Sequence, residues 1–177
     1  MSYEIFAEGT LTGTASSVDL TSIPQTATHL ELYFNSRSNK ADASHRGGYI
    51  RFNNISSNNY GIGGNYGEDS TTAAVWDRGM NTRAQIDDAI RHWNNNATAG
   101  LFAPSKIVIP NYTSTTIEVK GAIIQNSVWG DSTSIFWIMQ AMGHATVTGA
   151  AINRITIYPE SGSSFVAGTS YYLAGWE

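Results

Sequence analysis

Apolar and polar residues alternate in short runs along most of the chain. The clearest run is 29–35, where Leu30, Leu32 and Phe34 are separated by polar or amphipathic residues. Ile50 and Phe52 repeat the pattern within 49–53. A period of two residues is typical of a strand with one buried face. Both runs therefore predict strands whose apolar residues point into a core.

The segment 151–175 contains this alternation of apolar and polar residues twice. Ile155 and Ile157 alternate with more polar neighbours, and Pro159 ends the strand because it has no N–H to donate. Turn residues fill 161–164, and a second alternating run follows at 170–175. In 115–125, likewise, Ile117, Val119 and Ile123 alternate with polar residues. We expect strands in all three places.

Three segments are less regular. The glycine-rich segment 60–67 (YGIGGNYG) predicts a bulged strand or a loop. Within 81–94, Ile86, Ile90 and Trp93 have helical spacing, but 90–93 also fits a strand, and both readings stay open. The segment 134–142 (SIFWIMQAM) is apolar on both faces. It predicts a central strand or a strand that buries its outer face in a partner.

Strands of this length, separated by turn clusters, predict an all-β fold. We expect one domain over 1–177, an antiparallel β-sandwich of jelly-roll type with about eight to ten strands and at most one short helix. Charged residues make up only 14% of the chain, and the net charge is −4. Such a surface suits packing against protein or sugar, whereas a nucleic-acid partner would call for a basic patch. No segment approaches the roughly 18 apolar residues of a membrane-spanning helix.

The sequence contains no motif that carries recognisable chemistry. The glycine run at 61–64 lacks the Lys-Ser/Thr of a phosphate loop. The adjacent carboxylates at 68–69 and 87–88 fit a solvated surface, and the four histidines lack the close spacing of a zinc site. The chain has no cysteine, so it has no disulfide and no thiolate metal site. We therefore expect no enzymatic activity, no catalytic or metal-binding residues and no cofactor.

Four blocks together carry a family resemblance: ASSVDLTSIPQTATHLEL at 15–32, RFNNISSNNY at 51–60, IVIPNYTST at 107–115 and the segment 152–175. In these blocks the chain resembles small β-sandwich virion structural proteins of tailed bacteriophages. That family includes capsid decoration proteins and tail-fibre adhesins. The resemblance implies a virion protein made in the host cytoplasm, and the N-terminal residues, which lack a basic segment and a long apolar run, lead us to expect no signal peptide.

The resemblance leads to two expectations about function. The first is a capsid decoration protein that binds and stabilises the shell as a homo-oligomer, most simply a trimer, in contact with the major capsid protein or other virion proteins. The candidate contacts are apolar residues of the segment 134–142, which is apolar on both faces, and of an expected strand near the N-terminus. They are Ile135, Phe136, Trp137, Ile138, Ile5 and Phe6.

The alternative is a tail-fibre or receptor-binding module that recognises host-surface polysaccharide. Aromatic faces stack on the apolar face of a pyranose ring, and amide side chains hydrogen-bond sugar hydroxyls. Tyr60 and Tyr66, flanked by glycine and asparagine, and Trp76 are the candidate carbohydrate contacts. This reading requires these side chains to be exposed.

Overall fold

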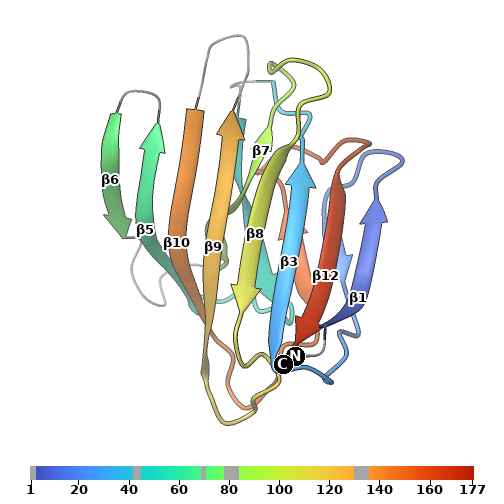
Figure 1. Ribbon diagram of the computed structural model, residues 1–177, viewed down its shortest axis with the longest axis vertical. Coiled ribbons are helices and arrows are strands. Elements are labelled where there is room, and N and C mark those ends of the chain that lie inside the picture. Colours follow the sequence, from blue (N-terminus) through green and yellow to red (C-terminus); the bar gives the residue numbers. More distant parts are fainter. Residues whose placement is uncertain (1–2, 42–44, 69–70, 78–83, 130–135) are drawn as a thin grey trace.

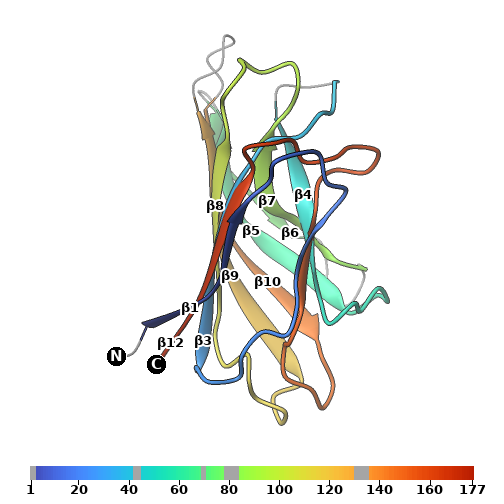
Figure 2. The ribbon, with the colours of Figure 1, turned by 90° about the vertical axis from the view of Figure 1, so that its right-hand side faces the viewer.

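Two antiparallel sheets pack face to face in the computed structural model, as Figures 1 and 2 show from two directions. The structure describes residues 3–41, 45–68, 71–77, 84–129 and 136–177. These residues form twelve strands and contain no helix. The expected all-β sandwich is confirmed, with more strands than the sequence pattern predicts.

The large sheet has eight strands and the small sheet has four. In spatial order, the large sheet comprises β1 (Tyr3–Thr10), β12 (Ser170–Trp176), β3 (His29–Ser36), β8 (Ala103–Ile109), β9 (Val119–Trp129), β10 (Phe136–Thr146), β5 (Tyr60–Glu68) and β6 (Thr71–Asp77). The small sheet comprises β2 (Val18–Leu20), β11 (Ile155–Tyr158), β4 (His45–Phe52) and β7 (Ile86–Trp93). Consecutive strands alternate between the sheets, with two exceptions: β5 and β6, and the run β8, β9 and β10, lie side by side in the large sheet.

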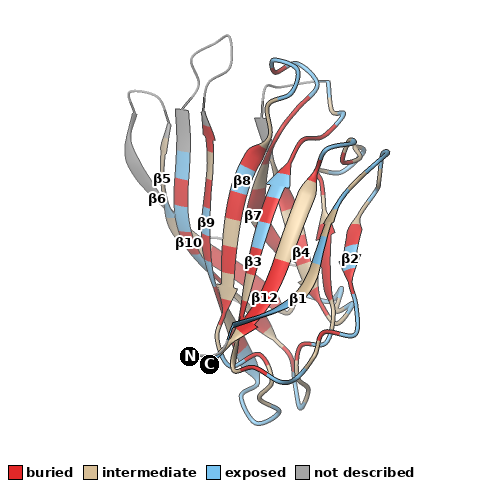
Figure 3. Ribbon diagram, turned by 45° about the vertical axis from the view of Figure 1, so that its right-hand side comes forward, coloured by how far each residue is buried: buried red, intermediate tan, exposed pale blue. Residues whose placement is uncertain are grey.

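The core lies between the sheets and uses the predicted faces of several strands. Leu30, Leu32 and Phe34 point inward from β3, and Ile50 and Phe52 point inward from β4. Figure 3 shows the resulting alternation of buried and exposed positions along the strands. Burying a side chain of this size stabilises the fold by about 1.5–3 kcal/mol. The two-residue period was therefore a sound guide to these strands.

Strand β7 overturns the helical alternative for 81–94. Its partner β4 pairs Ile50 with Ile86 and Gly48 with Ile90, so β7 contains extra residues between the two pairs. Asp88 lies in this irregular stretch with a left-handed φ of 54°. Ile86 and Ile90 are both fully buried. A separation of four residues places side chains on one face of a strand as well as on one face of a helix, so this spacing fits both structures.

Strand β9 carries apolar residues on both of its faces. Ile123 is 48% exposed, whereas Lys120, one residue out of phase with it, is 1% exposed. Lys120 can point inward because its ammonium group donates to the backbone oxygens of Ser114 and Asn111. Ala122 and Ile124 complete the inward face. The alternation at 115–125 was thus a correct signal of a strand, but its more hydrophobic residues do not mark the core side.

Strand β5 is the bulged strand that its glycines suggested. It pairs with β10 along its whole length and with β6 through a register shift between Tyr66 and Glu68. Gly61, Gly63 and Gly67 occupy the register positions of its outer face, opposite His144, Met142 and Ile138. The outer surface beside β10 is therefore mostly bare backbone, which leaves the side chains of β10 uncovered.

Candidate functional site

The outer face of the large sheet carries an exposed apolar strip on β9 and β10. Ile138 is 46% exposed and Met142 is 68% exposed, and Met142 pairs directly with Ile123 of β9. Val119 and Ile117 continue the exposed apolar surface toward the start of β9. We call these five residues the apolar strip. Several large apolar side chains on neighbouring strands mark a surface suited to contact with another protein.

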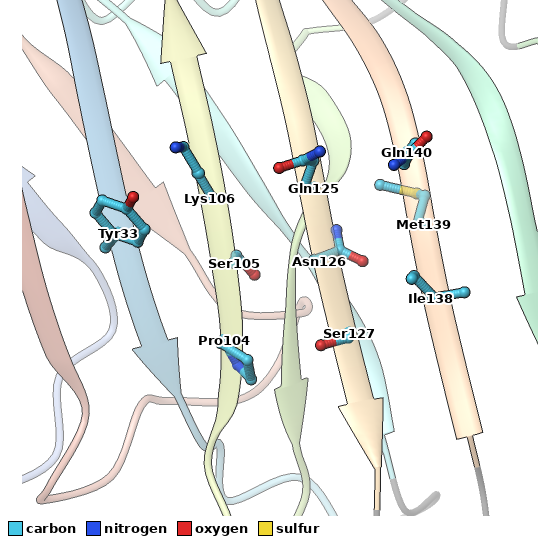
Figure 4. A pocket seen from close by; sticks show the side chains of 10 residues that line it. All are labelled: Tyr33, Pro104, Ser105, Lys106, Gln125, Asn126, Ser127, Ile138, Met139 and Gln140. Carbon is cyan, nitrogen blue, oxygen red and sulfur yellow. The ribbon is translucent and has the colours of Figure 1, made fainter.

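A polar row crosses the same face and separates Ile138 from the other residues of the apolar strip, because Gln140 and its partner Gln125 lie between Ile138 and Met142. Strand register aligns Tyr33 with Lys106, Lys106 with Gln125, and Gln125 with Gln140. Figure 4 shows these side chains on four adjacent strands, with Ile138 and Pro104 one register step away. A shallow depression of about 340 Å³ lies among them. Neighbouring strands are about 4.8 Å apart, so the two glutamines present adjacent amide groups to solvent.

One ion pair neutralises the charges in this row. Lys106 Nζ lies 2.8 Å from Glu31 Oε1 and 5.2 Å from the centre of the Tyr33 ring. The hydrogen bond to Glu31 raises the pKa of Lys106. Burial alone would raise the pKa of Glu31, but its hydrogen bonds and the Lys106 charge lower it. The face therefore offers a partner aromatic, amide and apolar groups with little net charge.

The structure divides the predicted contact residues between two sides of the sheet. Ile138 and Ile5 both point outward, and Ile5 is 54% exposed. Phe6 points the other way, packs against the core and fills the space beside Gly175. Ile135 lies outside the described residues. Phe136 and Trp137 belong to β10, but their side chains lie outside the described part.

The structure contradicts the prediction that Tyr60 is an exposed sugar contact. Its side chain is fully buried, its hydroxyl oxygen accepts from the Phe52 N–H at 2.9 Å, and the hydroxyl contacts the carbonyl oxygens of Phe52 and Ile55. Burial also raises the pKa of Tyr60. Tyr66 is half-buried and packs against the core. Trp76 pairs with Gly64 through the backbone, but its side chain lies outside the described part.

The sequence pattern did not predict the polar row. The alternation in 29–35 places Tyr33 outward, yet nothing in the chain specifies that it stands beside Lys106 and Gln125. That neighbourhood depends on register between strands that are distant in sequence. Sequence periodicity finds the face of each strand but not the row across strands.

Among the described residues, no cluster of three or more histidines, aspartates or glutamates could hold a metal ion. Nor does this part of the chain include a helix long and apolar enough to cross a bilayer. No known family model matches the chain, and neither the curated proteins nor the solved structures contain a significant match.

Proposed function

We propose that this protein is a non-enzymatic structural protein that attaches to another protein surface through the outer face of its large sheet. The observation that carries the proposal is the apolar strip, which leaves Ile138 and Met142 about half or more exposed on a central strand. Exposure of an apolar group of this size to water costs free energy, and a partner that covers the group removes this cost.

The specific setting we propose is decoration of a bacteriophage capsid. The resemblance in the four sequence blocks motivates it, and the low charge of the face fits it. Interface cores are depleted in charged residues and enriched in aromatic residues and methionine, as in the combination of Tyr33 and Met142 with one neutralised ion pair. In this proposal the partner is a shell protein, and the bound form is a homo-oligomer, most simply a trimer.

We further propose that eight of the strands form a jelly-roll core. Strands β1, β12, β3 and β8 would make one of its sheets, and β2, β11, β4 and β7 the other. The hairpins β5–β6 and β9–β10 would then be additions to one sheet. This arrangement is informative for function because the apolar strip lies largely on an added hairpin, not on the shared framework.

A binding experiment with purified particles tests the attachment. Wild-type protein, the double variant Ile138→Lys/Met142→Lys and the control Asn153→Lys are incubated with shells that lack the protein, and bound copies are counted after sedimentation. Asn153 is exposed in the loop before β11. We expect at least a tenfold loss of affinity for the double variant. The free-energy cost of burying an unpaired lysine exceeds about 1.4 kcal/mol, which corresponds to a tenfold change in affinity. The control should bind normally.

Cryo-electron microscopy of the same particles locates the protein. Density spread over the shell agrees with decoration, and density confined to the tail contradicts it. Absence from particles, together with a monomer at high concentration, would remove the proposal altogether. Equal binding of the double variant and wild type would show that the apolar strip is not the attachment surface.

A further inference from the structure

A second pocket lies on the opposite side of the molecule, on the outer face of the small sheet. It measures about 360 Å³ and is formed by β4, β11 and the loop 159–163. Tyr49 and Tyr158 are directly paired in the β4–β11 ladder, and Arg51 is one register step away. Ser16 closes one side of the pocket. We call this the Tyr49 pocket.

The aromatic and guanidinium groups in this pocket are held in place. The Arg51 Cζ atom lies 5.0 Å from the centre of the Tyr158 ring, and its Nη2 donates to Gln85 Oε1 at 2.9 Å. Gln85 in turn donates to Asp87 at 3.3 Å. A guanidinium fixed in this way presents its remaining N–H groups at a defined position, which lowers the entropy lost when a ligand binds.

One donor in the pocket has no partner within the protein. The Arg51 Nε atom is buried and makes no hydrogen bond. Buried polar groups in folded proteins are nearly always paired, with protein atoms, water or a ligand. Water or a ligand oxygen would satisfy this N–H.

The charges around the pocket are balanced. Arg51 and Glu160 both line it, so its charged lining consists of one cation and one anion. Tyr49 also experiences Asp87, Asp88 and Glu160: burial raises its pKa most, and these three carboxylates raise it further. An anionic ligand would meet these carboxylates at close range. A neutral ligand would encounter donors and acceptors without net repulsion.

We propose that the Tyr49 pocket binds a neutral pyranose sugar. Each sugar hydroxyl both donates and accepts, which matches a lining of Arg51, Gln85, Glu160 and serine hydroxyls. The apolar face of the ring would stack on Tyr49 or Tyr158. The volume falls within the range of small-molecule sites, about 300–1,000 Å³. The pocket replaces Tyr60 as the location for carbohydrate recognition.

The position of the pocket also fits the proposed function, although binding of the sugar does not depend on it. The outer faces of the two sheets point in opposite directions, as the edge view in Figure 2 shows. A copy attached through the apolar strip would leave the Tyr49 pocket open to solvent. This orientation rests on the proposed attachment, whereas the sugar site itself can be tested on the free protein.

Calorimetric titration of the free, full-length protein tests the proposal. The probes are glucose, galactose, mannose and N-acetylglucosamine, with glucuronic acid as the anionic comparison. We expect one neutral sugar to bind with a dissociation constant of about 1 mM or lower. Tyr158→Ala should weaken binding at least tenfold. Tyr33→Ala, which removes an aromatic ring from the opposite face, should leave it unchanged.

A blocking variant keeps the test decisive if Tyr158→Ala unfolds. Ser16→Phe places a bulky side chain at an exposed position of the pocket wall and should abolish binding without changing the melting temperature. No heat with any neutral sugar, a preference for glucuronic acid, or a loss caused by Tyr33→Ala alone would each overturn the proposal. Because no particles are used, failure here leaves the attachment proposal standing, and failure of attachment leaves the sugar site standing.

Discussion

The outer faces of the two sheets differ in how many of their side chains are held by hydrogen bonds. On the small sheet, Asp19 accepts hydrogen bonds from Thr156 at 2.6 Å and from Arg154 at 2.7 Å, and Arg51 is tied to Gln85. On the large sheet, the Lys106–Glu31 ion pair lies in the polar row, and the side chains of the apolar strip remain exposed. Both faces belong to one chain with one composition, so the difference arises from placement.

This difference indicates which face is complete without a partner. A hydrogen-bonded polar surface is stable in water, and covering it would require equivalent bonds to replace those lost. An apolar surface on central strands gains from being covered. Association through the large sheet is therefore the more favourable of the two. A ligand that binds the small sheet must supply specific hydrogen bonds.

The largest effect should separate the inner from the outer side of β9. Ile124→Ala removes a fully buried side chain and should destabilise the fold by about 2–5 kcal/mol. Ile123→Ala, one residue earlier and half exposed, should change the free energy of unfolding by less than about 1 kcal/mol. Urea denaturation measures both. Equal losses would mean that the apolar strip is already covered in the isolated protein.

A matched pair of glycines should give the next largest effect. A methyl group at Gly143 would lie 2.9 Å from the Ile86 side chain of β7, whereas one at Gly121 would meet nothing within 4 Å. Gly143→Ala should therefore destabilise by about 1–3 kcal/mol through overpacking between the sheets. Gly121→Ala should be neutral or slightly stabilising. Thermal melting of the two variants decides, and a neutral Gly143→Ala would contradict the close approach of β7 to β10.

The polar network of the small sheet should show a smaller contribution. Thr156→Val keeps the shape of the side chain but removes its hydrogen bond to Asp19, and should destabilise by about 1–2 kcal/mol. The reverse type of change on the other face, Val108→Thr, should stay within about 0.5 kcal/mol. If Val108→Thr proves the more damaging, the large sheet is not the open face that we infer.

The smallest effect is a pH dependence that both faces share. Burial alone would raise the pKa of Asp19, but hydrogen bonds from Thr156 and Arg154 outweigh it and lower the pKa below its usual value. A lowered folded-state pKa stabilises the protein above the unfolded pKa near 4, and this contribution is lost as pH falls through the folded value.

Asp19→Asn should therefore be less stable than wild type by up to about 1 kcal/mol at neutral pH, and the gap should close in acid. Glu31→Gln should behave alike, because the pKa of Glu31 is lowered as well. Urea unfolding at several pH values measures the gap, with the exposed Glu8→Gln as control. A gap that persists at low pH would show that the loss is not electrostatic.

Local patterns predicted the strands better than they predicted the surfaces. Alternation of apolar and polar residues located β3, β4, β11 and β12, because each of these strands has one face toward solvent and one face toward the core. It left helix and strand both open at β7, because a four-residue spacing fits one face of either structure. In β9 it did not show which face is buried, because loop carbonyl oxygens bind Lys120 on the inner side. Tyr60 was taken for an exposed residue because its glycine and asparagine neighbours are typical of loops. The pairs that build both candidate sites depend on register across the sheets, which no single stretch of sequence contains.

The pairing of β1 with β12 has a consequence for how the chain reaches this fold. Residues 3–10 find their ladder partner only in residues 170–176, so β1 cannot enter the large sheet until β12 has been synthesised. Pairings between distant segments slow folding, and strands without partners invite association with other chains. During synthesis, β3 also lacks β12 on one side. Completion of the large sheet therefore has to follow synthesis of β12, and the interval before it is when neighbouring nascent copies are most able to exchange strands.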